Sequence, residues 1–244
     1  MKVTPIILLL FYLTLTLCQR NGAEFPEMVG FYGYPSETHE VTTSDGYILT
    51  IFRIPSGRED QSGDGNSQPV LVMHGIPASS DSMIVNGADG SFSFVLADNS
   101  YDVWLINLRG NYYSRNHETL DPENDEEFWD YNLLDNVQDA MATVEYILAE
   151  TGFEQLIMVG VSHGSTVTLI SLATEPEWFA ERVSLFVGHV PISRLGGMTN
   201  PYFNLLTDDT TIELFGFLGL TEILSLNYLQ SVAMDVVCIP LPGL

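Results

Sequence analysis

Short runs of apolar residues, separated by polar or helix-like segments, dominate the pattern along the chain. The clearest are Val70–Met73, Val103–Leu108, Leu156–Val159 and Val183–Val190. Continuous apolar runs of roughly four to eight residues are typical of strands that are buried on both faces of a parallel sheet. Because these strands alternate with longer segments, the pattern predicts an α/β fold with a mostly parallel sheet.

Two other segments add a hairpin and a helix to this fold. His39–Thr43 and Tyr47–Ile54 flank the turn residues Ser44-Asp45-Gly46, which predicts an N-terminal antiparallel hairpin. Between Phe128 and Ala149, apolar residues recur at helical spacing, which predicts a helix packed on the core. These apolar residues are Val137, Met141, Val144 and Ile147.

The most informative motif is Gly160-Val161-Ser162-His163-Gly164, which lies between a predicted strand and a predicted helix. By composition alone, about one chain in ten of this length contains G-x-S-x-G, so the motif gains its weight from its position. A sharp strand-to-helix turn exposes the serine hydroxyl as a nucleophile, and glycines on both sides avoid clashes. The pattern therefore predicts Ser162 as a catalytic nucleophile.

A nucleophilic serine also requires hydrogen-bond donors for the oxyanion that forms during acyl transfer. In such a fold one donor is the backbone N–H after the serine, here that of His163. The other comes from the turn after an earlier strand, and His74-Gly75-Ile76 directly follows Val70–Met73. We expect the second donor to be the backbone N–H of Ile76. The alternative is that His74-Gly75 is an ordinary strand-ending turn.

Several other motifs occur in order along the chain. From roughly Glu27 onward these motifs resemble the acid lipases, the family that contains the gastric and lysosomal acid lipases. They are Gly33-Tyr34-Pro35, Asp45-Gly46-Tyr47-Ile48-Leu49, Arg53-Ile54-Pro55, His74-Gly75-Ile76-Pro77-Ala78-Ser79-Ser80 with Asn86-Gly87, Tyr101-Asp102-Val103-Trp104-Leu105 with Asn107, Arg109-Gly110-Asn111 with Tyr113-Ser114-Arg115, and Glu127-Phe128-Trp129-Asp130-Tyr131.

The resemblance implies an α/β-hydrolase core with a helical cap over the active site. It also implies hydrolysis of neutral lipid esters, triacylglycerols or cholesteryl esters, at a lipid–water interface and without a cofactor. Ser162 matches the nucleophile, and Ile76 and His163 match the oxyanion donors. The chain departs from the family's usual Gly-His-Ser-Gln-Gly elbow, because Val161 and His163 stand in place of the histidine and the glutamine.

A catalytic triad consists of the serine nucleophile, a histidine that acts as its base and an aspartate that orients the histidine. In this family the triad aspartate and histidine follow the cap, and the resemblance implies that this chain ends within the cap. We therefore expect neither triad Asp nor triad His in the chain, and we expect the last sheet strands to be missing. Apart from His163 in the elbow itself, the histidines are His39, His74, His117 and His189, and of these only His74 and His189 are expected near the carboxyl edge of the sheet. A complete substitute triad is not expected, because base and orienting acid must meet strict geometry.

Three regions are predicted along the chain. Residues 1–18 have a positive Lys2, a short apolar run and small residues before Gln19, which predicts a secretory signal rather than a membrane anchor. Residues 19–190 form the hydrolase core, and residues 191–244 begin the helical cap. A signal peptide implies a secreted or lysosomal protein, and no later segment predicts a transmembrane anchor. If Cys18 leaves with the signal, Cys238 is the remaining cysteine.

Charge and motif content narrow the functional classes. The formal net charge of −24 at pH 7 disfavours binding to nucleic acid and to anionic head groups. The sequence has no Walker loop, no dinucleotide fingerprint and no Cys/His cluster with zinc spacing, so no cofactor and no metal is predicted. The leading hypothesis is a serine lipase or carboxylesterase of lipid catabolism. The alternatives are a non-catalytic lipid-binding or yolk-type protein with a lipase fold, and an esterase of soluble substrates.

Overall fold

The computed structural model describes residues 23–59, 67–76, 78–194, 199, 208 and 210. The strands in these residues are β1 (Glu37–Thr42), β2 (Tyr47–Ile54), β3 (Pro69–Met73), β4 (Asp102–Ile106), β5 (Asn116–His117), β6 (Leu156–Val161) and β7 (Val183–His189). The α-helices are α2 (Phe25–Phe31), α3 (Phe92–Asp98), α4 (Asn136–Thr151), α5 (His163–Thr174) and α6 (Pro176–Arg182). Two short 3₁₀ helices are η1 (Ser80–Met83) and η2 (Glu126–Trp129).

The strands form one mixed sheet in the order β1-β2-β4-β3-β6-β7, with β5 paired to β2. β1, β2 and β5 pair antiparallel, whereas β4, β3, β6 and β7 are parallel to one another. In the parallel part, Met73 pairs with both Ile106 and Gly160, and Val161 pairs with His189. The residues that follow β3, β4 and β6 therefore meet at one edge of the sheet, where α/β folds place their sites.

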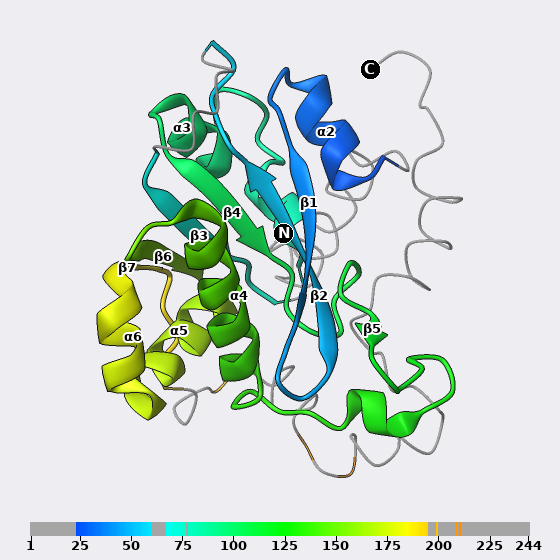
Figure 1. The fold of residues 1–244 in the computed structure, drawn as a ribbon. Coiled ribbons are helices and arrows are strands. Elements are labelled where there is room, and N and C mark those ends of the chain that lie inside the picture. Colours follow the sequence, from blue (N-terminus) through cyan, green and yellow to red (C-terminus); the bar gives the residue numbers. More distant parts are fainter. Residues whose placement is uncertain are drawn as a thin grey trace.

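Alternate residues of the buried strands point to opposite faces of the sheet, and helices cover both faces. Leu71 and Met73 lie in a core cluster with residues of α4, α5 and α6, while Val70 and Val72 pack with residues of α2 and α3. α4, α5 and α6 lie close together in Figure 1. Burial on both faces explains why these strands are continuous apolar runs.

The predicted α/β architecture, with its mostly parallel sheet and N-terminal antiparallel strands, is confirmed. The helix predicted from Phe128 is shorter at its start, because α4 begins at Asn136. The backbone N–H of Asn132 donates to Asp135 Oδ2 at 2.7 Å, and that of Leu134 donates to Asn132 Oδ1 at 2.9 Å. Side chains that bond the local backbone in this way compete with the helix and hold a turn instead.

The two ends of the chain carry predictions that the described residues do not reach. The predicted signal peptide (residues 1–18) and almost all of the predicted cap (residues 191–244), with Cys238, lie outside them. Within the described residues, none of the helices is both long enough and apolar enough to cross a membrane. In the same residues, no group of three or more His, Cys, Asp or Glu side chains is arranged to hold a metal ion.

Candidate active site

The turn between β6 and α5 has the strained backbone of a nucleophile elbow. Ser162 has φ 52° and ψ −112°, a conformation that costs a non-glycine residue about 1 to 3 kcal/mol. A Cβ on Gly160 would lie 2.5 Å from the backbone nitrogen of Ser165, and a Cβ on Gly164 would overlap the carbonyl oxygen of Met73. Glycine at both positions is therefore a steric requirement of the close strand–helix approach.

The elbow is fastened to the end of the neighbouring strand. The backbone N–H of Ser162 donates to the carbonyl oxygen of His189 at 2.9 Å, at the end of β7. The hydroxyl of Ser165 donates to the carbonyl oxygen of Gly160. Ser162 also caps α5, so the backbone N–H of His163 is in the first turn, where helix N–H groups have no intrahelical partner. This N–H is suitably placed to donate to an anion beside Ser162.

The turn after β3 lies directly against the elbow. A Cβ on Gly75 would lie 3.2 Å from Ser162 Cβ and 3.7 Å from Ser162 Oγ, so the Gly75 backbone is close to the hydroxyl. Ile76 follows, and this residue is 62% exposed. The structure thus places the turn that contains Gly75 and Ile76 at the same edge of the sheet as Ser162 and His163, with Gly75 in contact with Ser162.

His74 has a defined protonation state in this turn. Its Nε2 is 3.2 Å from the backbone nitrogen of Leu108 and 3.1 Å from Asn111 Nδ2, and its Nδ1 is 2.8 Å from the carbonyl oxygen of Gly75. A backbone N–H can only donate, so Nε2 accepts and Nδ1–H donates to Gly75. Burial lowers the pKa of His74 to about 4, and the bond to Gly75 only partly opposes this. Both ring nitrogens are occupied, so His74 is unavailable as a base for Ser162.

The buried neutral His74 makes stability depend on pH. Its folded pKa of about 4 is below the unfolded value of about 6.5, so its contribution is present above pH 6.5 and is lost as the pH falls toward 4. His74→Asn removes this titration. We expect the wild-type advantage in unfolding free energy over His74→Asn to shrink by about 2 kcal/mol between pH 7 and pH 5. Urea denaturation at both pH values measures this difference, and an advantage independent of pH would contradict it.

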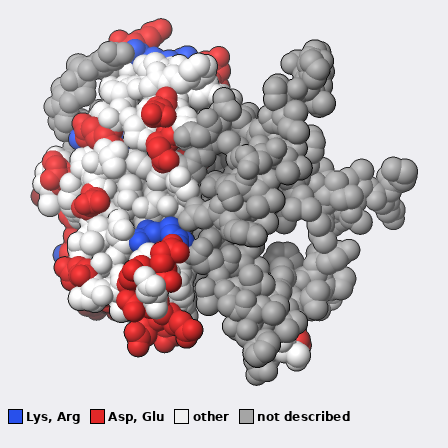
Figure 2. All heavy atoms as spheres, turned by 90° about the vertical axis from the view of Figure 1, so that its right-hand side faces the viewer, with Lys and Arg blue, Asp and Glu red and all other residues white. Residues whose placement is uncertain are grey.

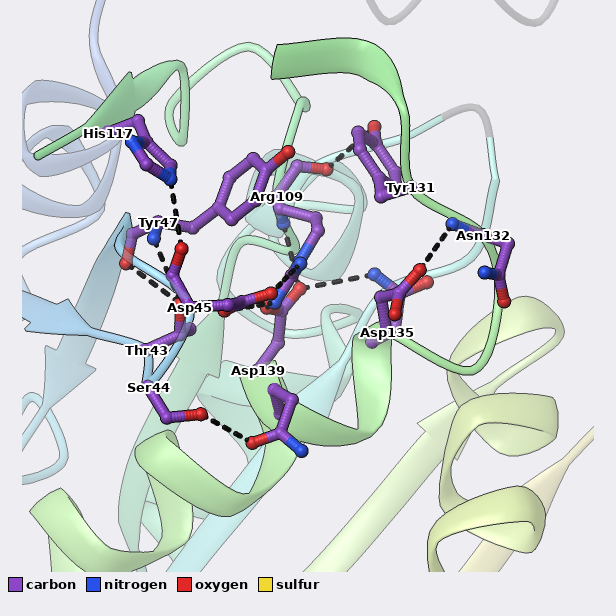
Figure 3. A network of polar contacts seen from close by, with 12 residues as sticks. Thr43, Ser44, Asp45, Tyr47, Arg109, His117, Tyr131, Asn132, Asp135 and Asp139 are labelled. Carbon is purple, nitrogen blue, oxygen red and sulfur yellow. Dashed lines mark hydrogen bonds and ion pairs between the residues drawn. The ribbon is translucent and has the colours of Figure 1, made fainter. Parts of the chain in front are cut away.

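A network of ion pairs involves the loop that follows β4, and in it Arg109 and Asp139 are buried whereas Asp45 is exposed (Figure 3). The Arg109 guanidinium donates to Asp139 Oδ1 at 2.7 Å and to Asp45 Oδ2 at 2.6 Å, and it lies 4.1 Å from the centre of the Tyr47 ring. The backbone N–H of Arg109 also donates to Asp139 Oδ2 at 3.0 Å. The network joins the hairpin turn, this loop and α4. Burial acts to raise the pKa of Asp45, but hydrogen bonds from Arg109 and Thr43 outweigh it and lower that pKa.

The hydrogen bonds of the described histidines do not involve the Ser162 hydroxyl. None of the hydrogen bonds among the described residues joins a histidine or a carboxylate to Ser162 Oγ. His39 contacts Tyr146 and Glu37, and His117 contacts the carbonyl oxygen of Asp45. Burial lowers the pKa of the His163 ring, which favours its neutral form beside the serine. His189 contributes its carbonyl oxygen to the elbow and is otherwise exposed.

Two asparagines beside the oxyanion turn had no role assigned from the sequence. Asn107 and Asn111 bond to residues at the two ends of the segment that begins at His74. A signal was present, because both lie in the Asn107…Arg109-Gly110-Asn111 motif that resembles the acid lipases. Their contacts depend on the pairing of β3 with β4, which that motif does not specify.

Comparisons with known proteins show which families this chain resembles in sequence. Residues 25–87 match the partial alpha/beta-hydrolase lipase region, and residues 68–219 match the alpha/beta hydrolase fold. A relative from Homo sapiens, lysosomal acid lipase/cholesteryl ester hydrolase, is 39% identical over 193 residues, which cover 78% of this chain and 48% of that protein. Gastric triacylglycerol lipase from Bos taurus is 37% identical over 181 residues, which cover 74% of this chain and 45% of that protein.

Solved structures with a similar fold are more distant in sequence. A carboxylesterase from Bacillus subtilis is 15% identical with a TM-score of 0.46, covering 72% of this chain and 50% of that one. An epoxide hydrolase from Vigna radiata is 18% identical with a TM-score of 0.45, and the match covers 70% of this chain and 44% of that one. The chain spans about half the length of the curated relatives it matches.

Proposed function

Because the chain belongs to the α/β-hydrolase fold family and has acid lipases among its relatives, we propose that Ser162 is the nucleophile of a lipase. The backbone N–H groups of Ile76 and His163 are its oxyanion donors. The observation that carries this proposal is the strained Ser162 elbow with the Gly75 backbone packed against it. Acyl transfer needs a serine whose strained backbone presents its hydroxyl next to two backbone N–H donors.

The chemistry follows from these positions. Ser162 Oγ attacks the ester carbonyl carbon and loses its proton to a base, and the carbonyl oxygen becomes an oxyanion that accepts hydrogen bonds from the Ile76 and His163 N–H groups. The carbon–oxygen bond to the alcohol breaks, and the alcohol leaves with a proton. Water then attacks the acyl-enzyme and releases the fatty acid. Among the described residues, no histidine or carboxylate is hydrogen-bonded to Ser162 Oγ, so neither the base nor its orienting acid is assigned.

We propose neutral lipid esters as the substrate class, triacylglycerols or cholesteryl esters at a lipid–water interface. The human relative is named as a lipase and cholesteryl ester hydrolase, and the bovine one as a triacylglycerol lipase. The exposed apolar side chain of Ile76 beside the nucleophile suits an apolar acyl group. Figure 2 shows acidic side chains spread over the described part of one face, which favours a neutral rather than an anionic lipid. A signal peptide and a secreted or lysosomal location complete this proposal.

A fluorophosphonate probe tests whether Ser162 is an activated serine. Serine hydrolases whose triad is removed keep part of their rate enhancement through the oxyanion hole, so we expect slow but selective labelling of Ser162 in this chain. Peptide mapping compares Ser162 with the exposed Ser44, which is the internal control. Ser162→Ala is expected to abolish the selective labelling.

Equal labelling of Ser162 and Ser44 in folded protein would overturn the enzymatic proposal. A non-catalytic lipid-binding protein with a lipase fold would then be favoured. If Ser162 is labelled, activity on emulsified long-chain esters against soluble short-chain esters separates a lipase from an esterase of soluble substrates.

A further inference from the structure

The loop after β4, Asn107–Asn111, contacts both ends of the segment that carries the proposed oxyanion donor Ile76. We propose that Asn107 and Asn111 are positioning residues, which hold the Ile76 N–H beside Ser162 by bracing His74 and Ser80. This inference rests on the proposed function, because it assigns a role within the same site. It is carried by hydrogen bonds whose directions are all determined.

Asn111 braces the beginning of the segment. Its Oδ1 accepts the backbone N–H groups of Tyr113 at 3.0 Å and Ser114 at 3.1 Å. This fixes the amide orientation, because a backbone N–H can only donate. Asn111 Nδ2 therefore donates, and its two acceptors are His74 Nε2 at 3.1 Å and Asn107 Oδ1 at 2.8 Å. The Nδ1–H of His74 in turn holds the carbonyl of Gly75, whose peptide carbon is bonded to the Ile76 nitrogen.

Asn107 braces the other end of the segment. Its Oδ1 accepts the backbone N–H of Ser80 at 3.1 Å, and its Nδ2 donates to the carbonyl oxygen of Thr50 on β2 at 3.1 Å. The side chain is fully buried, so each of these bonds replaces a lost contact with water. The single oxygen of Asn107 thus joins Ser80 to Asn111, and the two ends of the segment share one connected network.

The loop can act as a brace because it is itself held firmly. Ser114 Oγ donates to the carbonyl oxygen of Asn107 at 2.7 Å, and the backbone N–H of Gly110 donates to the carbonyl oxygen of Ser114 at 2.8 Å. Below the loop, the buried ion pair of Arg109 with Asp139 joins it to α4, as Figure 3 shows. Held in this way, the asparagines set the orientation of the Gly75–Ile76 peptide, and a small misplacement of such a donor costs a large part of the rate.

Asn111→Asp is the most direct test, because it keeps the shape and reverses the hydrogen bonds. One carboxylate oxygen still accepts from Tyr113 and Ser114, but the other faces Asn107 Oδ1 and His74 Nε2, which are both acceptors. We expect labelling of Ser162 by the fluorophosphonate to slow by about 10- to 100-fold. Asn99→Asp, the same change at an exposed residue after α3, is the control and is expected to leave the rate unchanged.

A second readout distinguishes positioning from a general loss of structure. Histidine ¹⁵N NMR reports the protonation of His74, whose signals are identified by their loss in His74→Asn. His163 is the titratable neighbour that affects the pKa of His74, and it is unchanged between the wild type and Asn111→Asp. The new carboxylate near Nε2 favours imidazolium, so His74 in Asn111→Asp is expected to titrate about one pH unit or more above its wild-type value.

The outcomes separate the two proposals. If the wild type is labelled and Asn111→Asp is labelled at a rate within about twofold of it, the brace is overturned while the proposed function stands. If the wild type is not labelled, the proposed function fails and the positioning role falls with it. An unshifted His74 titration in Asn111→Asp overturns the brace separately, because Asn111 would then not contact His74. Should Asn111→Asp not fold, Asn111→Ala at this half-buried position replaces it, with the same expected loss of labelling.

Discussion

Replacing Arg109 with methionine is expected to lower the free energy of unfolding by about 3 to 5 kcal/mol. The Asp139 side chain has no exposed surface, and Arg109 is its ion-pair partner at 2.7 Å. Removal of the guanidinium leaves a buried carboxylate with too few donors, which costs more than the ion pair itself contributes. Burial already raises the pKa of Asp139 against the opposing effect of Arg109, so its carboxyl is expected to take up a proton more readily in the variant.

Urea denaturation followed by circular dichroism measures the effect of Arg109→Met. Arg58→Met is the matched control, because Arg58 pairs with Asp89 and Asp98 on the surface, where solvent screens the charges. The control is expected to change stability far less. A loss below about 1 kcal/mol for Arg109→Met would show that the network of Figure 3 does not stabilise the fold as its burial indicates.

Gly164→Ala is expected to lower the free energy of unfolding by at least about 3 kcal/mol, although it adds a single methyl group. The new Cβ would overlap the carbonyl oxygen of Met73 and would lie 2.8 Å from that of His74. Both are backbone atoms at the end of β3, so no side-chain rotation relieves the contact. The helix must move away from the sheet, and Ser162 moves with it.

The control for Gly164→Ala is a glycine-to-alanine substitution at a position where the added Cβ meets no other atom. Gly30 lies in α2, and a Cβ there would meet no atom within 4 Å. Gly30→Ala is therefore expected to be neutral or to stabilise the chain by up to about 1 kcal/mol. Equal effects of the two substitutions on the denaturation midpoint would show that helix propensity, and not the close approach at the elbow, decides the outcome.

The sequence allowed the prediction of those features that depend on local pattern or on steric exclusion. The buried strands β3, β4 and β6 follow from their apolar runs, and the elbow follows from glycines that no other residue can replace. The fourth run, β7, is an edge strand of the described sheet, and its Leu185 and Val187 are exposed. The start of α4 was wrong because Asn132 and Asp135 bond to the nearby backbone, and apolar periodicity does not record such bonds. The brace by Asn107 and Asn111 was not predicted because it joins the ends of β3 and β4. Those ends meet only through the register of the sheet.

The hydrogen bond from Ser162 N–H to the His189 carbonyl has a consequence for the order in which the protein is built. During synthesis, the ribosome completes the G-x-S-x-G residues well before it reaches His189. A nascent chain that ends between them contains the nucleophile but not the acceptor that helps to hold its strained backbone. The hydrogen bond that holds the Ser162 backbone can therefore form only once β7 has been synthesised, after the serine itself has been added to the chain.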